Sequence, residues 1–363
     1  MKVGILTFPN SISYGACLQM IALQDTVRRL GHEAEIINYH NPYMKAEKHT
    51  RKGRSPLKSA LQRQVRLLMH RRLYADFARF ERRQVTHYPA RPFTEKKRLA
   101  EVGRRYDAVI CGSDQVWNPY ITDSDLSYFL DFCDQNTKRV AYAPSFGVET
   151  FPRGFVDSLT PQLEQFHALS AREQAGKELV ERLTGRETTL VTDPTWLVEA
   201  DRWAQMETAH PAAQGDYVLY FVVNQSKELL ARCRAFAKEQ GLRVVVIGGN
   251  PVTARKNKDP MLTYATDVAP DRWLYLIHHA RYVFTNSFHG TAFSVLFERD
   301  VYVQVPPHNG SRLRQVLESL GMEHCEVRQG EALSDRPVDY DYARTVFARL
   351  RADSMAYLAD ALQ

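Results

Sequence analysis

Short apolar runs alternate with amphipathic stretches along nearly the whole chain, and this alternation is what most constrains the fold. The pattern opens with an apolar run at residues 2–8, a helical stretch at 14–30 closed by Gly31, and a second apolar run at 33–39. The runs have the length of strands and the stretches have helical periodicity, and glycine is the usual residue just beyond a helix end. Alternation in this order favours a parallel sheet with helices on both faces.

The alternation falls into two series, separated by a polar stretch at residues 210–215. Further apolar runs lie at residues 106–111, 139–144 and 188–193 in the first series, and at 217–223, 242–248, 282–286 and 301–305 in the second. One hydrophobic core stops growing efficiently beyond about 250–300 residues, so a chain of 363 residues has the length of two domains. We therefore expect an α/β fold of two Rossmann-like, doubly wound domains that face a cleft.

The polar stretch and the periodicity set the expected domain limits. Residues 1–205 form the expected N-terminal Rossmann-like domain, and residues 206–338 form the C-terminal one. Residues 339–363 are helical by periodicity and form a candidate C-terminal helix that packs across both domains. Doubly wound domains bind ligands beyond the carboxyl ends of their strands, so the cleft between the domains is the expected site.

Composition excludes several classes of protein. Hydrophobic residues make up 44% of the chain and charged residues 25%, close to the averages for soluble globular proteins. No stretch approaches the roughly 18 consecutive apolar residues of a membrane-spanning helix, and the N-terminus lacks the apolar region of a signal peptide. We therefore expect a cytoplasmic protein. Its five cysteines are scattered and lack CxxC spacing, so neither a disulfide framework nor a metal site is expected.

A basic helical insertion is expected at residues 45–84. It has 13 Lys or Arg against 3 Asp or Glu between Lys45 and Arg83, in a chain whose formal net charge is +6. Apolar residues recur through it at helical spacing: Leu57, Leu61, Val65, Leu68, Leu73, Phe77 and Phe80. Such a helix suits an anionic membrane surface; the alternative is a helix packed on the first domain with its arginines in water. No nucleic-acid-binding motif accompanies the charge, so no nucleic-acid partner is expected.

The segment Thr285–Phe293, TNSFHGTAF, joins the end of an apolar run to the start of a helix. Backbone N–H groups in a first helical turn lack intrahelical partners, and the helix dipole is positive there. Such a start favours an anion such as phosphate. Ser287, His289 and Gly290 are therefore candidate anion-binding residues, and His289 can also carry a proton. The alternative is an ordinary helix N-cap with a structural histidine.

A second polar loop, Cys111–Pro119 with the sequence CGSDQVWNP, follows the apolar run at 106–111. Its carboxylate, amide and aromatic side chains suit a sugar, because sugar hydroxyls need donors and acceptors while the C–H faces stack on a ring. The candidate sugar-binding residues are Ser113, Asp114, Gln115, Trp117 and Asn118, together with Tyr14 at the start of the first helical stretch. The alternative is a well-capped turn in which Trp117 fills the core.

Two arginines near expected strand ends are further candidate anion ligands. Arg172 lies at the start of a helical stretch in the segment AREQ, and Arg312 lies in NGSRLR after the run at 301–305. A guanidinium can bind a planar carboxylate through two hydrogen bonds. The alternative for either arginine is a solvated surface charge.

Several motifs together resemble the polysaccharide pyruvyl transferase family. In chain order they are GILTF, NSISYGACLQ, CGSDQVWNP, AYAPSFG, the helix that opens with Arg172, TDPTWL, TNSFHGTAFSVLF and SRLRQVLESLG, spanning roughly Lys2 to Gly321. The resemblance implies a GT-B-like transferase that moves pyruvyl from phosphoenolpyruvate to a sugar of a bacterial exopolysaccharide, capsule or cell-wall polymer precursor. The product is a pyruvate ketal, and phosphate is released. Phosphoenolpyruvate is the donor substrate, and no metal or obligate cofactor is expected.

The resemblance also implies roles for the candidate residues. His289 and Arg172 match the family's donor-binding histidine and arginine. Many members have an arginine where this chain has Ser287, and Arg312 is the substitute that we expect. Asp114 is the candidate base or acceptor-orienting group, which makes His289, Arg172 and Asp114 the candidate catalytic residues. The first domain is then the acceptor side and the second domain the donor side.

The expected acceptor is a sugar or a lipid-linked oligosaccharide, with peripheral contact at the inner face of the membrane through residues 45–84. Two other functions stay open at this point. A GT-B glycosyltransferase that uses a nucleotide sugar is the rival enzyme, because a fold alone does not choose a donor. A non-catalytic carbohydrate-binding protein is the rival from another class.

Overall fold

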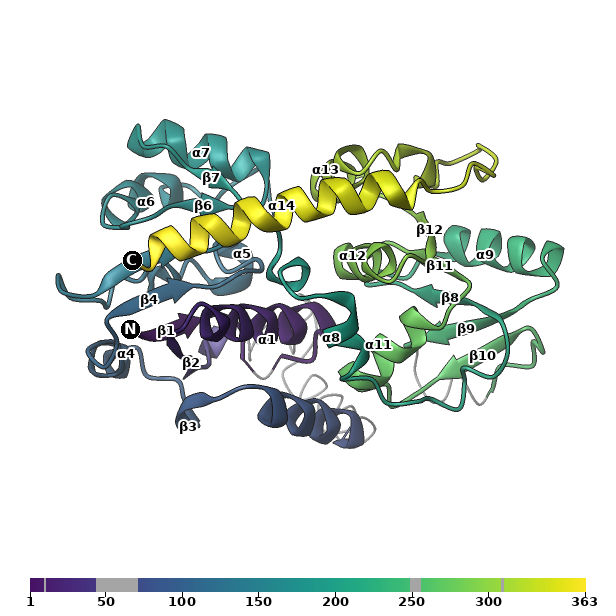
Figure 1. The fold of residues 1–363 in the computed structure, drawn as a ribbon, viewed down its shortest axis with the longest axis horizontal. Helices are drawn as coiled ribbons and strands as arrows, with labels where there is room; N and C mark the ends of the chain where they lie inside the picture. Colours follow the sequence, from purple (N-terminus) through teal and green to yellow (C-terminus); the bar gives the residue numbers. More distant parts are fainter. Residues whose placement is uncertain (10, 44–70, 249–255, 308–309) are drawn as a thin grey trace. The chain divides into compact units, whose positions relative to one another are not determined.

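The computed structural model describes residues 1–9, 11–43, 71–248, 256–307 and 310–363 (Figure 1). The chain divides into two compact units: unit 1 comprises Met1–Val198 and Leu350–Gln363, and unit 2 comprises Glu199–Arg349. The predicted boundary after residue 205 falls inside unit 2, because helix α8 (Ala200–Ala204) belongs to that unit.

Unit 1 is built on a five-stranded sheet whose neighbouring strands are all parallel, in the order β3–β2–β1–β4–β5. The strands are β1 (Lys2–Leu6), β2 (Glu33–Tyr39), β3 (His87–Phe93), β4 (Ala108–Cys111) and β5 (Lys138–Ala141). Val3 of β1 lies opposite Ala34 of β2 and Ala108 of β4. Crossovers between parallel strands cover both faces of a sheet, which is why all four residues of β4 are buried.

A short two-stranded parallel pair, β6 (Ser170–Ala171) and β7 (Thr189–Leu190), follows β5 in the chain. A parallel bridge between Val140 and Ala168 joins this pair to the edge of the main sheet. The helices of unit 1 include α1 (Tyr14–Arg29), α4 (Lys97–Gly103), α5 (Pro119–Thr122), α6 (Phe155–Leu163) and α7 (Gln174–Thr184), with 3-10 turns η1 (Leu126–Phe129) and η2 (Pro194–Trp196). The predicted stop of the first helix is confirmed, since Gly31 follows α1 with a φ of 88°.

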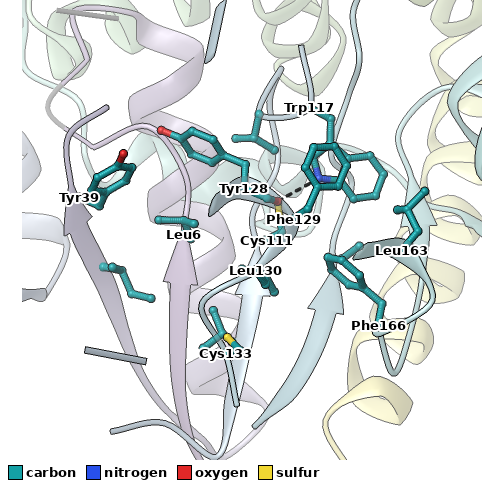
Figure 2. Close-up of a cluster of buried hydrophobic side chains, with 14 of the residues drawn as sticks. Leu6, Tyr39, Cys111, Trp117, Tyr128, Phe129, Leu130, Cys133, Leu163 and Phe166 are labelled. Atoms are coloured by element: carbon teal, nitrogen blue, oxygen red, sulfur yellow. Dashed lines mark hydrogen bonds between the residues drawn. The ribbon is translucent and has the colours of Figure 1, made fainter. Parts of the chain in front are cut away.

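Aromatic side chains pack together in the unit 1 core, among them Trp117 of the loop that follows β4 (Figure 2). The ring of Trp117 stacks on Phe129 with centroids 5.0 Å apart. Its indole N–H donates a 3.0 Å hydrogen bond to the backbone oxygen of Tyr128. A buried indole needs such an acceptor, so Trp117 joins η1 to the loop that follows β4.

Unit 2 repeats the architecture of unit 1 with a parallel sheet in the order β10–β9–β8–β11–β12. Its strands are β8 (Tyr217–Phe221), β9 (Arg243–Ile247), β10 (Leu262–Ala265), β11 (Tyr282–Thr285) and β12 (Asp300–Val303). Its described helices include α9 (Lys227–Glu239), α11 (Pro270–His278), α12 (Phe288–Leu296) and α13 (Ser311–Ser319), with the 3-10 turn η3 (Glu323–Cys325). The predicted α/β class with two Rossmann-like domains is confirmed.

The last helix, α14 (Tyr340–Ala361), contributes residues to both units. Its first residue belongs to unit 2, where the Tyr340 hydroxyl donates a 2.7 Å hydrogen bond to the backbone oxygen of Arg299. Its later residues belong to unit 1, where the Arg351 Nε donates to the backbone oxygen of Trp196 at 2.7 Å. One continuous helix is therefore hydrogen-bonded within each unit.

The described part of the basic segment is helical over residues 71–84, whereas residues 44–70 lie outside the described residues. Phe77 and Phe80 are buried, and the ring of Phe77 packs on Tyr14 of α1 with centroids 5.2 Å apart. This end of the apolar stripe therefore packs on unit 1, as the structural alternative expects. Membrane contact through the rest of the segment stays a prediction. No helix in the described part of the chain combines the length and hydropathy that crossing a bilayer requires.

Gly4, in the middle of β1, offers a test of how tightly unit 1 is packed. A Cβ at this position would lie 2.7 Å from Cδ2 of the Tyr106 ring, and overpacking of this kind typically costs about 1–3 kcal/mol. We expect Gly4→Ala to lower the free energy of unfolding by that amount in urea denaturation. The matched control is Gly176→Ala in α7, where the new Cβ would meet no atom closer than 3.5 Å. Equal stability of the two variants would contradict the packing described here.

Candidate functional site

The strand order of each unit indicates where a ligand site is expected. In unit 1 the chain moves from β1 to β2 and β3 on one side, then to β4 and β5 on the other. In unit 2 it moves likewise from β8 to β9 and β10, then to β11 and β12. Ligands of doubly wound sheets bind at such reversal points, beyond the carboxyl ends of the strands. The loop after β4 and the helix start after β11 are therefore the places to examine.

In unit 1, one guanidinium is surrounded by three carboxyl groups at the carboxyl ends of β4, β6 and β7. The nitrogen atoms of Arg172 approach them as follows: Nη1 lies 2.7 Å from Asp193 Oδ2, Nε 3.2 Å from Glu173 Oε1, and Nη2 3.8 Å from Asp114 Oδ1. Ser113 joins the cluster, since its Oγ lies 3.4 Å from Nη1 of Arg172. We call these five residues the Arg172 cluster.

Local backbone features hold two carboxyl groups of the Arg172 cluster in place. Asp114 has a φ of 76°, a conformation that asparagine and aspartate tolerate better than most residues, and its backbone forms a parallel bridge with Pro144. Asp193 caps η2 because its Oδ1 accepts hydrogen bonds from the N–H of Thr195 at 3.0 Å and from its hydroxyl at 2.8 Å. The other oxygen of Asp193 is thereby left to face Arg172.

The electrostatics of the cluster determine what Arg172 can do. Burial disfavours the charged guanidinium, but Glu173, Asp193 and Asp114 outweigh that effect and raise the pKa of Arg172 above its ordinary value. Its side chain is 2% exposed, against 16% for Asp114. Two of its nitrogens already lie within hydrogen-bond distance of carboxyl groups of unit 1, Nε beside Glu173 and Nη1 beside Asp193. Contact of Arg172 with a donor carboxylate stays a prediction. Asp114 is the more accessible member of the pair.

The loop after β4 contains the other predicted sugar-binding residues, and most of them hold the loop together. Trp117 is fully buried, so the prediction that its face stacks on a sugar is wrong, and the core-filling alternative is correct. Asn118 is 3% exposed. Its side chain caps α5 through the N–H of Tyr120 and donates a 2.9 Å hydrogen bond to Gln115 Oε1. Asn118 therefore has a structural role in the loop.

Two further predicted acceptor residues lie at the same edge of unit 1. Tyr14 is the first residue of α1, and burial raises the pKa of its hydroxyl above the ordinary value. Gln115 is half-buried, and its Oε1 would lie 2.1 Å from a Cβ added at Gly147. Their contact with an acceptor stays a prediction.

In unit 2, the helix start predicted from the sequence is present at the end of β11. Ser287 is the N-cap of α12, and its Oγ accepts a 3.2 Å hydrogen bond from the N–H of Gly290. Gly290 is required for packing, since a Cβ there would lie 2.4 Å from Thr285 Oγ1. His289 is half-buried in the first turn, and its ring lies edge-on to Phe288 with centroids 5.1 Å apart.

Arg312 is brought to the same edge of the unit 2 sheet as His289. It lies in the first turn of α13, which follows β12, while His289 lies in the first turn of α12, which follows β11. β11 and β12 are adjacent parallel strands, and Arg312 is half-buried. Unit 2 thus presents an imidazole and a guanidinium on neighbouring helix starts, a combination suited to an anion.

Two members of the Arg172 cluster, Glu173 and Asp193, were missed by the sequence-based prediction. A local signal existed for Asp193, because aspartate followed by proline at a helix start is a typical N-cap sequence. Nothing local signals Glu173. Its role follows only from the position of Arg172 next to it and from the strand order that brings Asp114 and Asp193 together.

Solved structures with the same architecture support the fold at low sequence identity. A Listeria monocytogenes protein assigned as a UDP-N-acetylglucosamine 2-epimerase has a TM-score of 0.57 and 10% identity, covering 99% of this chain and 90% of that chain. S. aureus MnaA bound to UDP has a TM-score of 0.51 and 11% identity, covering 97% and 90%. An alpha-glucosyltransferase in complex with UDP and DNA has a TM-score of 0.50 and 8% identity, covering 99% and 95%. These likenesses show the GT-B fold.

The family assignment comes from the sequence itself. A comparison with curated protein sequences returned no match. The family model described as polysaccharide pyruvyl transferase matches residues 14–303, a range that includes both the Arg172 cluster and the helix start at Phe288. The chain therefore belongs to the polysaccharide pyruvyl transferase family.

Proposed function

We propose that this protein transfers a pyruvyl group from phosphoenolpyruvate to a sugar of a bacterial exopolysaccharide, capsule or cell-wall polymer precursor. Membership of the pyruvyl transferase family supports the reaction class. The observation that carries the donor assignment is the pair of helix starts at His289 and Arg312, on adjacent strands of unit 2. The acceptor assignment rests on Asp114, whose side chain is more exposed than that of its ion-pair partner Arg172.

Unit 2 is the proposed donor side. Phosphoenolpyruvate carries a phosphate and a carboxylate, so its site must offset negative charge. The α12 and α13 starts supply positive dipole ends, Arg312 supplies a permanent cation, and His289 supplies a group that donates a hydrogen bond or a proton. The Ser287 hydroxyl caps α12, so in this proposal it supports the donor site by fixing the helix start.

Unit 1 is the proposed acceptor side, with Asp114 as the base that receives a proton from a sugar hydroxyl. The guanidinium of Arg172, whose Nη2 lies 3.8 Å from Asp114 Oδ1, fixes the position of that carboxyl group. We therefore assign Arg172 as a positioning residue for the acceptor side. In this proposal Arg172 is still needed for the reaction, but it acts by holding Asp114 in place and not by binding the donor.

The reaction balances with these groups. The methylene carbon of phosphoenolpyruvate gains a proton, for which His289 is the proposed donor, and the oxygen of one sugar hydroxyl bonds to the neighbouring carbon. A second hydroxyl of the same sugar then attacks that carbon and displaces phosphate. Of the two hydroxyl protons, Asp114 receives one, which then leaves with phosphate, and the other restores the proton that His289 gave to the methyl group. The product is a pyruvate ketal.

The rival functions differ in the donor substrate that the protein would consume. A nucleotide-sugar glycosyltransferase shares the fold, and two of the similar structures contain UDP. Incubation of the protein and an acceptor with phosphoenolpyruvate or with nucleotide sugars, followed by mass spectrometry of the acceptor, distinguishes a pyruvate ketal from an added sugar. A carbohydrate-binding protein without activity would turn over neither donor.

His289 is the residue whose loss tests the proposed donor chemistry. We expect His289→Ala to lower phosphate release from phosphoenolpyruvate by about 100-fold or more, as removal of a general acid typically does. The matched control is His324→Ala in η3, which should keep wild-type turnover. Circular dichroism and thermal unfolding establish that both variants fold. Near-normal turnover of His289→Ala would remove this residue from the reaction.

Arg172 is expected to affect stability as well as turnover, because it neutralises carboxyl groups in a buried cluster. Removing one partner of a buried ion pair typically costs about 3–5 kcal/mol, so we expect Arg172→Ala to lower the free energy of unfolding by that amount. Adding Asp193→Asn should restore part of the loss. The control is Arg328→Ala, whose guanidinium is 54% exposed and whose loss should change little. Urea denaturation measures all four proteins. If Arg172→Ala were as stable as Arg328→Ala, the buried ion cluster would be excluded.

A further inference from the structure

Three side chains with metal-ligating atoms lie together in unit 2, apart from the candidate functional site. The Nδ1 atom of His278 lies 2.7 Å from Glu207 Oε1, and the Nε2 atom of His279 lies 3.3 Å from Glu207 Oε2. One ligand atom from each residue can be chosen so that all lie within 4.8 Å of one another. We call this group the Glu207 cluster.

Packing fixes the Glu207 cluster before any ligand binds. The ring of His278 stacks on Phe297 with centroids 4.3 Å apart and an interplanar angle of 16°. The ring of His279 packs on Tyr275, with centroids 4.1 Å apart. The segment that carries Glu207 is joined to the first turn of α11 by a 3.2 Å hydrogen bond from the Thr208 N–H to the Asp271 backbone oxygen. A site whose ligands are held by such supporting contacts loses little entropy on binding a cation.

The electrostatic setting also favours a cation. His278 is the last residue of α11 and His279 is its C-cap, so both imidazoles lie at the negative end of the helix dipole. The carboxylate of Glu207 is 9% exposed, and it accepts a hydrogen bond from an N–H of each imidazole if both contacts are hydrogen bonds. A divalent cation would replace those two hydrogen bonds with direct bonds from two nitrogen atoms and one oxygen atom.

We propose that Glu207, His278 and His279 bind one divalent transition-metal ion of the zinc type. Two imidazoles and one carboxylate suit zinc and similar borderline metals, whereas magnesium and calcium prefer oxygen ligands. His279 is 46% exposed, so water can complete the coordination. The site is structural: it joins the chain that follows α8 to the end of α11. It is also separate from the proposed chemistry, because α11 leads into the start of β11 while His289 follows the end of the same strand.

Isothermal titration calorimetry with zinc chloride tests this proposal, using the full chain without a polyhistidine tag and after removal of metals by a chelator. The wild-type protein should bind one equivalent of zinc, and magnesium chloride should give no binding. Glu207→Gln and, separately, His279→Ala should weaken zinc binding by about tenfold or more. The control Glu331→Gln removes a carboxylate that is 62% exposed in the same unit and should bind zinc like the wild type.

A second measurement keeps the test decisive if Glu207→Gln folds poorly. Saturating zinc should raise the Tm of the wild type and of Glu331→Gln, because a ligand that binds only the folded state stabilises it. At the same zinc concentration it should raise the Tm of His279→Ala by less; this side chain is exposed enough to be removed without loss of the fold. Wild-type protein that binds no zinc, or a His279→Ala variant that binds zinc as tightly as the wild type, would overturn the proposal. Either result leaves the proposed pyruvyl transfer unaffected, since the cluster contains none of its residues.

Discussion

Parallel pairing of every strand in both five-stranded sheets is the constraint on which the described structure depends. A parallel neighbour cannot be reached by a hairpin, so each connection crosses a face of the sheet and all carboxyl ends come to one edge. The direction of winding reverses between β1 and β4 in unit 1 and between β8 and β11 in unit 2. Polar residues distant in sequence meet at these ends: Asp114 follows β4, and Arg172 follows β6, whose strand pair is joined to the main sheet by the bridge between Val140 and Ala168.

The central strands were predictable because they are buried on both faces and therefore read as continuous apolar runs. The strands at two outer edges were not predicted from the sequence. β3 has mostly half-buried and exposed residues, and three of the four residues of β10 are half-buried. An edge strand with one partner and a partly solvated face needs no apolar run, so its sequence resembles that of a loop.

The parts of the candidate site that were predicted from the sequence are those formed by residues close together in the chain. The start of α12 was predicted because an N-cap serine and its hydrogen bond to Gly290 involve residues close in the chain. The side chains that surround Arg172 were not predicted, because its contacts with Asp193 and Ser113 join residues that are 21 and 59 positions apart in the chain. Trp117 shows a different limit: an aromatic residue in a polar loop fits either a sugar platform or a core filler, and only its stacking on Phe129 decides between them.

The division of α14 between the two units affects how the protein denatures. A helix is a cooperative structure, in which unwinding of one turn weakens the next. Because the same helix is hydrogen-bonded to Arg299 in unit 2 and to Trp196 in unit 1, melting of either unit removes support from a segment that the other requires. The two Rossmann-like units are thus thermodynamically linked through a shared element, and their heat-induced transitions should merge rather than occur as two independent steps.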